Sequence, residues 1–169
     1  PGNIHKEDHE YKRNGTRSLF MSYAPLEGWR HVEVSERRTK IDWAHCVRRI
    51  VDDHFPQAEK IVLVEDNLNT HALGSLYAAF SPEEASRISA KLELQFTPKH
   101  GSWLNMAEIE ISVLQKQCLQ RRIPDAEFLE KEIAEWERQR NAQKAGTDWR
   151  FDLADARVKL KRLYPSNQL

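Results

Sequence analysis

The fold of this chain depends on one short stretch, IVLVED at residues 61–66. Its first four residues are apolar with no polar residue between them, which predicts a strand buried on both faces in the middle of a mixed sheet covered by helices. The stretch ends in two acids, and Asp66 is expected just past the carboxyl end of the strand. Open α/β sheets usually bind their ligands at that edge, so Asp66 is a candidate site residue.

Two strands and a helix are expected before this stretch. Residues 16–23 and 29–34 are rich in aromatic and β-compatible residues and are separated by a proline and a glycine, so they are expected to form neighbouring antiparallel strands. Thr39 and Asp42 have the spacing of a helix capping box, and apolar residues then recur at helical spacing as far as Phe55. The first part of the chain is therefore predicted to be a hairpin followed by a helix.

Helices predominate after the stretch. Ser81-Pro82 followed by two acids is a typical helix start. The expected order is helix, helix, strand and three further helices, at residues 72–79, 81–90, 92–96 and 105–120, after Pro124, and around residues 156–163. This order fits a single α/β domain over residues 1–169, with helices on the faces of its sheet.

The bulk composition does not indicate a partner. Lys plus Arg and Asp plus Glu both number 26, and no apolar stretch approaches the length that spans a membrane. Cys46 and Cys118 lie far apart on helical patterns, and we expect them to be reduced core thiols of a cytoplasmic protein. The sequence opens at Pro1 with neither an initiating Met nor a signal-peptide pattern, which suggests a truncated beginning.

Asp66 and Glu108 form the candidate site, and because they are 42 positions apart (108 minus 66) only the fold can bring them together. Two carboxylates on rigid elements would suit a hard cation, Mg²⁺ or Mn²⁺. Each acid also has a structural interpretation. Asp66 could end the strand or cap the following turn. Glu108 stands three positions after Asn105, the spacing of a helix capping interaction, and Glu110 is an equally charged neighbour.

Two segments around these acids resemble a known family. VEDNLNTH at residues 64–71 resembles the second-aspartate motif of DDE transposases of the Tc/mariner superfamily, an Asp-Asn pair followed by a nearby His. TPKHGSWLNMAE at residues 97–108 is similar to the segment that carries the third acid in the bacterial insertion-sequence branch, where Leu-Asn and two further residues precede the catalytic Glu. This alignment selects Glu108 rather than Glu110, and the resemblance extends over nearly the whole chain.

The resemblance implies a fold, an activity and a set of ligands. It implies an RNase H-like mixed sheet with helices on both faces, a site for two Mg²⁺ or Mn²⁺ ions, and cleavage and strand transfer at transposon ends by a homodimer bound to DNA. Asp66 and Glu108 would be the metal ligands. Further residues of the two segments are expected to support these ligands or to contact DNA: Asn67, His71, Lys99, His100 and Asn105.

The chain departs from the family at the first acid of the triad. In the family that acid lies on the first strand, upstream of the hairpin, and no residue before Asn14-Gly15 can inherit its role. The sequence is therefore interpreted as an N-terminally truncated domain, without its first strand and upstream DNA-binding domain, and we expect it to be inactive as it stands. Two alternatives remain open: a catalytically silent DNA-binding or dimerising remnant, and another RNase H-like nuclease that acts without strand transfer.

Overall fold

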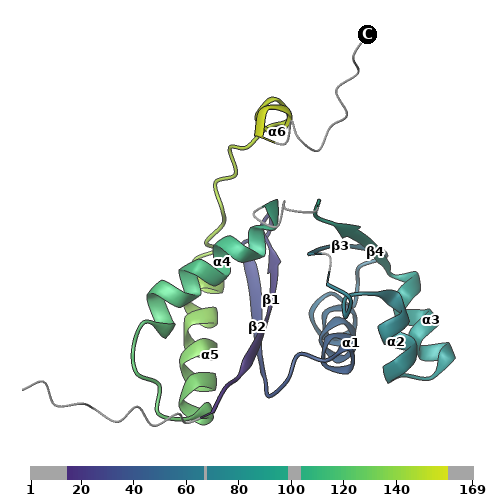
Figure 1. Cartoon of the computed structure of the whole chain (residues 1–169), viewed down its shortest axis with the longest axis horizontal. Helices are drawn as coiled ribbons and strands as arrows, with labels where there is room; N and C mark the ends of the chain where they lie inside the picture. The colour runs from purple at the N-terminus through teal and green to yellow at the C-terminus, as the bar shows by residue number, and fades with distance from the viewer. Residues whose placement is uncertain (1–14, 67, 99–103, 160–169) are drawn as a thin grey trace, which may run out of the picture.

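The secondary structure follows the order expected from the sequence (Figure 1). The computed structural model describes residues 15–66, 68–98 and 104–159. Two short segments, η1 and η3, are π-helical continuations of the helices before them. The elements are β1 (Ser18–Ala24), β2 (Trp29–Ser35), α1 (Lys40–Arg49), η1 (Ile50–His54), β3 (Ile61–Glu65), α2 (Leu73–Ala79), α3 (Pro82–Ala90), β4 (Leu92–Phe96), α4 (Met106–Leu114), η3 (Gln115–Leu119), α5 (Ala126–Ala142) and α6 (Leu153–Lys159).

The strands form two separate two-stranded sheets. β1 and β2 are antiparallel, with Ser18 opposite Ser35 at one end and Ala24 opposite Trp29 at the other. β3 and β4 are parallel, with Glu65 opposite Phe96 at their carboxyl ends. The expectation of one continuous mixed sheet is therefore not met within the described ranges, because β1 and β3 do not pair with each other there.

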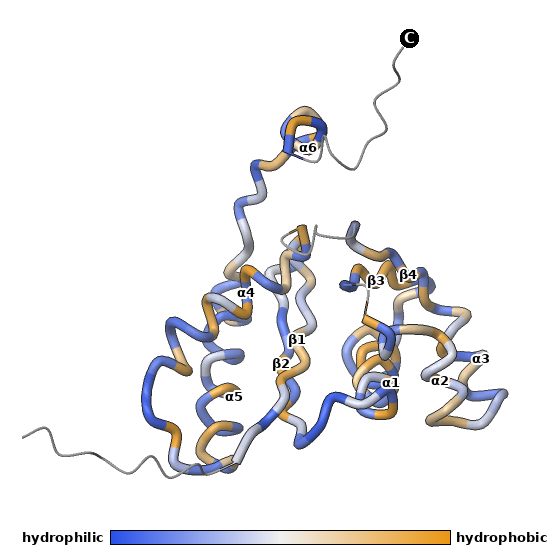
Figure 2. Tube along the Cα trace, in the orientation of Figure 1, coloured by the Kyte–Doolittle hydropathy of each residue, from blue (hydrophilic) through white to orange (hydrophobic). Residues whose placement is uncertain are grey.

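Helices cover both faces of the β1–β2 hairpin. Alternate side chains of a strand point to opposite faces, so Phe20 packs toward α1 and its core cluster whereas Leu19 and Met21 pack toward α4 and α5. Figure 2 shows hydrophobic residues recurring between hydrophilic ones along these helices, as expected of helices that bury one face. The buried residues of the second cluster are Val32, Leu114, Cys118, Ile133 and Trp136.

The β3–β4 sheet is covered on one face only. Ile61 and Leu63 pack against the core cluster formed with α1, α2 and α3, but the side chains of Val62 and Val64 are 58% and 51% exposed. The prediction that residues 61–64 are buried on both faces is therefore wrong. Val62 and Val64 point away from the three helices, and no described element buries them on the other face.

The helix starts agree with the expected capping signals. Thr39 and Asp42 form a reciprocal capping box at the start of α1, with the Thr39 N–H donating to Asp42 Oδ2 at 2.7 Å. Ser81 caps α3, and Pro82 occupies its first turn. No helix in the described part of the chain is both long enough and apolar enough to cross a membrane.

The two cysteines are buried free thiols, as expected from their helical patterns. Cys46 lies in α1, where burial raises the pKa of its thiol to about 12. Because the thiolate is the reactive form, Cys46 is expected to be chemically inert at neutral pH.

A buried ion cluster joins β2, α4 and α5. Glu110 of α4 is only 1% exposed and accepts hydrogen bonds from Nε and Nη2 of Arg140 at 2.7 and 3.1 Å. Nε of the fully buried Arg30 lies 2.8 Å from Glu110 Oε1, an ion-pair distance without hydrogen-bonding geometry. Two guanidinium groups from different elements thus compensate one buried carboxylate.

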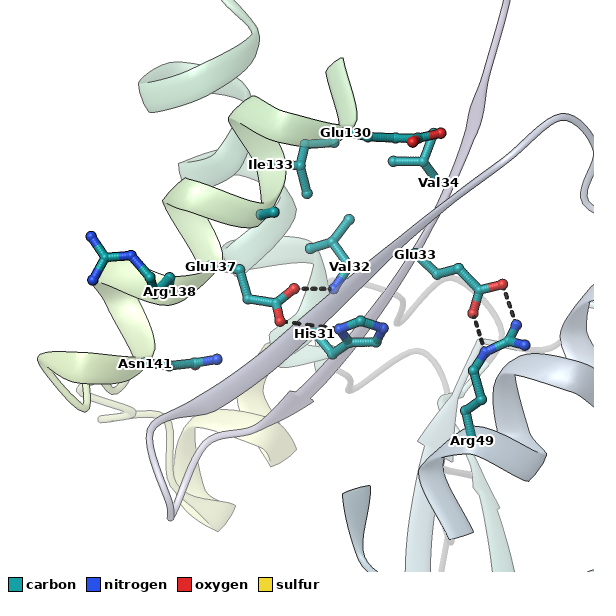
Figure 3. Close-up of a pocket in the computed structure, with 11 residues that line it drawn as sticks. His31, Val32, Glu33, Val34, Arg49, Glu130, Ile133, Glu137, Arg138 and Asn141 are labelled. Carbon is teal, nitrogen blue, oxygen red and sulfur yellow. Dashed lines mark hydrogen bonds and ion pairs between the residues drawn. The ribbon is translucent and has the colours of Figure 1, made fainter. Parts of the chain in front are cut away.

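Side chains of α5 close part of the outer edge of β2. Asn141 accepts a hydrogen bond from the Arg30 N–H at 2.9 Å and donates one to the Arg30 carbonyl at 2.8 Å, much as a neighbouring strand would. One helical turn earlier, Glu137 accepts from the Val32 N–H at 2.9 Å (Figure 3). These contacts satisfy backbone groups of an edge strand that would otherwise be open to pairing with another chain.

Replacing Glu110 by Gln is expected to lower the free energy of unfolding by about 3–5 kcal/mol, because two arginines would lose the charge that compensates them. Urea denaturation measures this change. Glu135→Gln is the control, because Glu135 is an exposed acid of α5 that pairs with Arg138, and it should have little effect. Equal destabilisation by the two substitutions would contradict a structural role for the ion cluster.

Candidate functional site

Asp66 lies directly after the carboxyl end of β3, as expected. The Thr97 N–H donates to the Glu65 carbonyl at 2.9 Å, which ties this point to the end of β4. The backbone carbonyl of Asp66 accepts from the Leu68 N–H at 2.8 Å, so the turn is closed by the backbone. The Asp66 side chain remains 39% exposed. Its carboxylate therefore lies at the edge of the sheet. It forms no hydrogen bond that caps the turn with any residue that the structure describes.

His71 lies next to the Asp66 carboxylate. Nδ1 of His71 lies 3.1 Å from Oδ1 of Asp66, close enough for an ion pair when the ring is protonated but without hydrogen-bonding geometry. The His71 ring also stacks on Trp43 of α1, with 5.9 Å between ring centroids and 20° between ring planes. His71 therefore lies beside the acidic residue whose motif it shares, and its expected supporting role stays a prediction.

Glu65 is a buried acid that the sequence reasoning did not select. Its side chain points toward α1, and its Oε1 accepts a hydrogen bond from Trp43 Nε1 at 2.8 Å, whereas its buried Oε2 has no partner in the described residues. Burial raises the pKa of Glu65 to about 7, against the opposing effect of the Trp43 hydrogen bond and with a smaller contribution from Asp66. The alternation from Ile61 and Leu63 could have indicated it, because an acid two positions further falls on the same inward face.

Glu108 and Glu110 have opposite environments although both lie near the start of α4. Glu108, in the first turn, is exposed, whereas Glu110 is enclosed in the ion cluster. Asn105 caps the helix by accepting from the Ala107 N–H at 3.1 Å. In the described part of the structure the Glu108 carboxylate makes no capping hydrogen bond to Asn105, so the structural interpretation of Glu108 as a capping acid is not supported.

The elements that carry the two candidate acids have ends on the same side of the molecule in the view of Figure 1. β3 and β4 are parallel, so their carboxyl ends share an edge, and Figure 1 shows the end of β4 and the beginning of α4 together at the top of the view. Residues 15–66, 68–98 and 104–159 contain no group of three or more His, Cys, Asp or Glu side chains that could hold a metal ion. That Asp66 and Glu108 share a metal stays a prediction. Three further expected site residues, Asn67, Lys99 and His100, lie outside the described residues.

The chemistry of the two acids fits a hard divalent cation. Both are oxygen donors that solvent reaches, with Glu108 exposed and Asp66 partly exposed, and neither forms an ion pair with Lys or Arg among the residues that the structure describes. Glu110, by contrast, is already compensated by two arginines. Mg²⁺ and Mn²⁺ prefer carboxylate ligands and keep several waters, which suits donors at an open edge.

A cavity of about 770 Å³ lies elsewhere, between β2 and α5 (Figure 3). Four of its polar groups are paired with one another: Glu33 forms a bidentate ion pair with Arg49, and Glu137 lies 3.1 Å from Nδ1 of His31. None of the expected site residues lines it. We therefore place the candidate site at the edge that carries Asp66, not in this cavity.

Glu65 is expected to make stability depend on pH. Its carboxyl has a pKa of about 7 in the folded protein and an ordinary value of 4.5 in the unfolded chain, so between these values the folded state holds the extra proton. The free energy of unfolding should fall as pH rises through this window, by at most about 1.4 kcal/mol per pH unit. Urea denaturation in metal-free buffer measures the slope, and Glu65→Gln should flatten it. An unchanged slope in the variant would exclude Glu65 as its cause.

Comparison with known proteins identifies one family. The model of a family described as DDE superfamily endonuclease matches residues 1–130, a segment that includes both Asp66 and Glu108. No curated protein and no solved structure was found to match the chain. Because the family match covers 130 of the 169 residues, the chain belongs to the DDE superfamily endonucleases, a family of DNA nucleases that generally use divalent metal ions.

Proposed function

We propose that this chain is the catalytic core of a transposase that cleaves DNA at transposon ends and transfers the cut strand, with Asp66 and Glu108 as metal ligands. Family membership supports a nuclease acting on DNA. The resemblance of residues 64–71 and 97–108 to the Tc/mariner and insertion-sequence motifs supports the more specific activity. DNA is the expected partner, and we propose a homodimer acting in the cytoplasm.

The proposal rests on a difference between the acids: two arginines compensate Glu110, whereas Glu108 and Asp66 pair with no Lys or Arg among the described residues. Successive residues of an α-helix are rotated by about 100°, so two positions apart they point in nearly opposite directions. The arginines that enclose Glu110 therefore leave Glu108 facing outward. The Asp66 side chain is 39% exposed at the end of β3. A metal site needs acids whose charge is not already neutralised by the protein, and among the described residues neither of these two is paired with Lys or Arg.

We further propose that the two small sheets belong to one RNase H-like sheet. Within the described ranges β1 pairs only with β2, and β3 only with β4, so each has an unpaired edge. In Figure 1, β1 and β3 are the strands of each sheet that lie nearest the other sheet. A strand upstream of the hairpin, the one that carries the first acid in the family, would pair with both edges and join the sheets.

In this proposal each residue has a stated role. Asp66 and Glu108 bind Mg²⁺ or Mn²⁺ together with the upstream acid, and His71 orients the Asp66 carboxylate. When bound, a pair of such ions neutralises charge on the attacking and leaving oxygens of an in-line displacement. Four residues around the two motifs are proposed to support the ligands or contact DNA: Asn67, Lys99, His100 and Asn105.

A second candidate is a catalytically silent DNA-binding or dimerising remnant. It is favoured by one observation, that the described residues hold no cluster of three metal-binding side chains. A site with two of three carboxylates should bind its ions weakly. For this reason the enzyme assay below uses the chain extended at its amino end by the strand expected to carry the first aspartate.

In the extended chain, Asp66→Asn and Glu108→Gln should each reduce Mg²⁺-dependent nicking of a transposon-end duplex by more than about a hundredfold. Loss of even an outer-shell partner costs about 10–100-fold, and a direct ligand matters more. Nicking is followed on a labelled duplex. The control is Glu83→Gln, an exposed acid that, like Glu108 in α4, lies in the first turn of its helix, and it should leave nicking unchanged.

The same assay separates the alternatives. Unchanged nicking in both ligand variants would refute the site. Nicking by the extended chain without strand joining would favour a simple nuclease over a transposase. No nicking by the extended chain, with intact binding of the duplex, would favour the silent remnant.

A further inference from the structure

We infer that Trp43 of α1 is a positioning residue for the Asp66 carboxylate. It acts through two residues that it contacts, one before and one after Asp66 in the sequence. The inference rests on the proposed role of Asp66 as a metal ligand. Trp43 is 3% exposed and does not reach Asp66 itself among the described contacts. It contacts the residue before Asp66 and the histidine after it, so its effect on the carboxylate is indirect.

The first contact holds the backbone before Asp66. The indole N–H of Trp43 donates to Glu65 Oε1 at 2.8 Å, a bond that is buried at both ends. Within the described residues no other group donates to the Glu65 carboxyl, because Oε2 has no hydrogen-bond partner there. Glu65 also joins β3 to the end of β4 through its carbonyl, which accepts from the Thr97 N–H. The peptide that leads into Asp66 is therefore fixed by a side chain from α1 and by the backbone N–H of Thr97, the residue directly after β4.

The second contact holds the side chain beside Asp66. The indole ring stacks on the ring of His71 at 20° between ring planes, and Nδ1 of His71 lies 3.1 Å from Asp66 Oδ1. The stack limits the rotation of His71 and keeps its nitrogen next to the carboxylate. One indole thus acts on Asp66 through the main chain and through a neighbouring ring.

Trp43 is itself rigidly held. It belongs to a buried cluster with Ala44, Val47 and Val51, in which no residue is more than a few per cent exposed. The start of its helix is fixed by a capping box, and Arg49 near the end of the helix is ion-paired with Glu33 of β2. Functional groups need such support, because small displacements of a ligand weaken metal binding strongly.

The alternative is that Trp43 only fills the core. Trp136 of α5 offers a matched comparison: it is 7% exposed, and its indole N–H donates to Gln117 Oε1 at 2.9 Å. The two tryptophans are therefore buried to a similar extent and both donate through the indole N–H, although the acceptor of Trp136 is exposed and that of Trp43 is buried. Trp136 belongs to the other core cluster and has no described contact with Asp66, Glu65 or His71.

The experiment compares Mn²⁺ binding by Trp43→Phe, Trp43→Leu and Trp136→Phe in the extended chain, measured from the free-ion signal in electron paramagnetic resonance. Phe keeps a ring that can stack on His71 but lacks the N–H, whereas Leu lacks both. We expect the Kd for Mn²⁺ to rise about tenfold in Trp43→Phe, and further in Trp43→Leu, because the loss of supporting contacts costs about 10–100-fold in metal affinity. Trp136→Phe should leave the Kd unchanged.

Urea denaturation of the same variants separates positioning from stability. Weaker Mn²⁺ binding in Trp43→Phe but not in Trp136→Phe, with both variants folded, is the expected result. An equal Kd in these two variants would overturn the inference, even if Trp43→Leu does not fold. Asp66→Asn tests the proposed metal site separately from the role of Trp43. If Asp66→Asn weakens Mn²⁺ binding while Trp43→Phe does not, only the role of Trp43 fails. If Asp66→Asn leaves the Kd unchanged, the proposed site fails and the role of Trp43 with it.

Discussion

The buried carboxylate of Glu110 is the constraint on which the arrangement of the site depends. Taking a charge out of water is costly unless opposite charges lie close to it, and here they come from β2 and α5. Only one rotation of α4 about its axis brings Glu110 to both arginines. That rotation turns Glu108 toward solvent. A structural ion cluster thereby decides which of two neighbouring acids is available for chemistry.

The helix α1 connects this part of the molecule to the other candidate acid. It packs against the hairpin through Phe20 and the Arg49–Glu33 pair, and it packs under β3 and β4 through the other core cluster. Through Trp43 it also reaches both neighbours of Asp66. The edge that carries Asp66 is therefore supported from the interior, whereas the opposite face of β3 and β4 is left exposed. Rigid support beneath an open edge is what a site that must admit a large substrate such as DNA requires.

Local signals in the sequence predicted the elements well because those signals act locally. The capping box of Thr39 and Asp42 and the Ser81-Pro82 start are satisfied within one helical turn, so they did not depend on the rest of the chain. The expectations that failed concern longer-range packing: the single continuous sheet, and the burial of residues 61–64 on both faces. An unbroken apolar run shows that a strand can be buried on both faces, but it does not show whether another element is available to cover the second face, and Val62 and Val64 remain exposed.

Local patterns along the chain were enough to predict the order of elements, and the motifs pointed to Asp66 and Glu108 and to the family. The family segment around residues 97–108 selected Glu108 over Glu110, but spacing and charge could not explain the choice. The tertiary structure shows that Glu110 is compensated by two arginines whereas Glu108 is exposed, and it shows which donor, Trp43, meets the buried carboxyl of Glu65. The physical reason is that desolvation and ion pairing depend on groups from distant parts of the chain. Arg30 and Arg140 become neighbours of Glu110 only when β2, α4 and α5 have packed together.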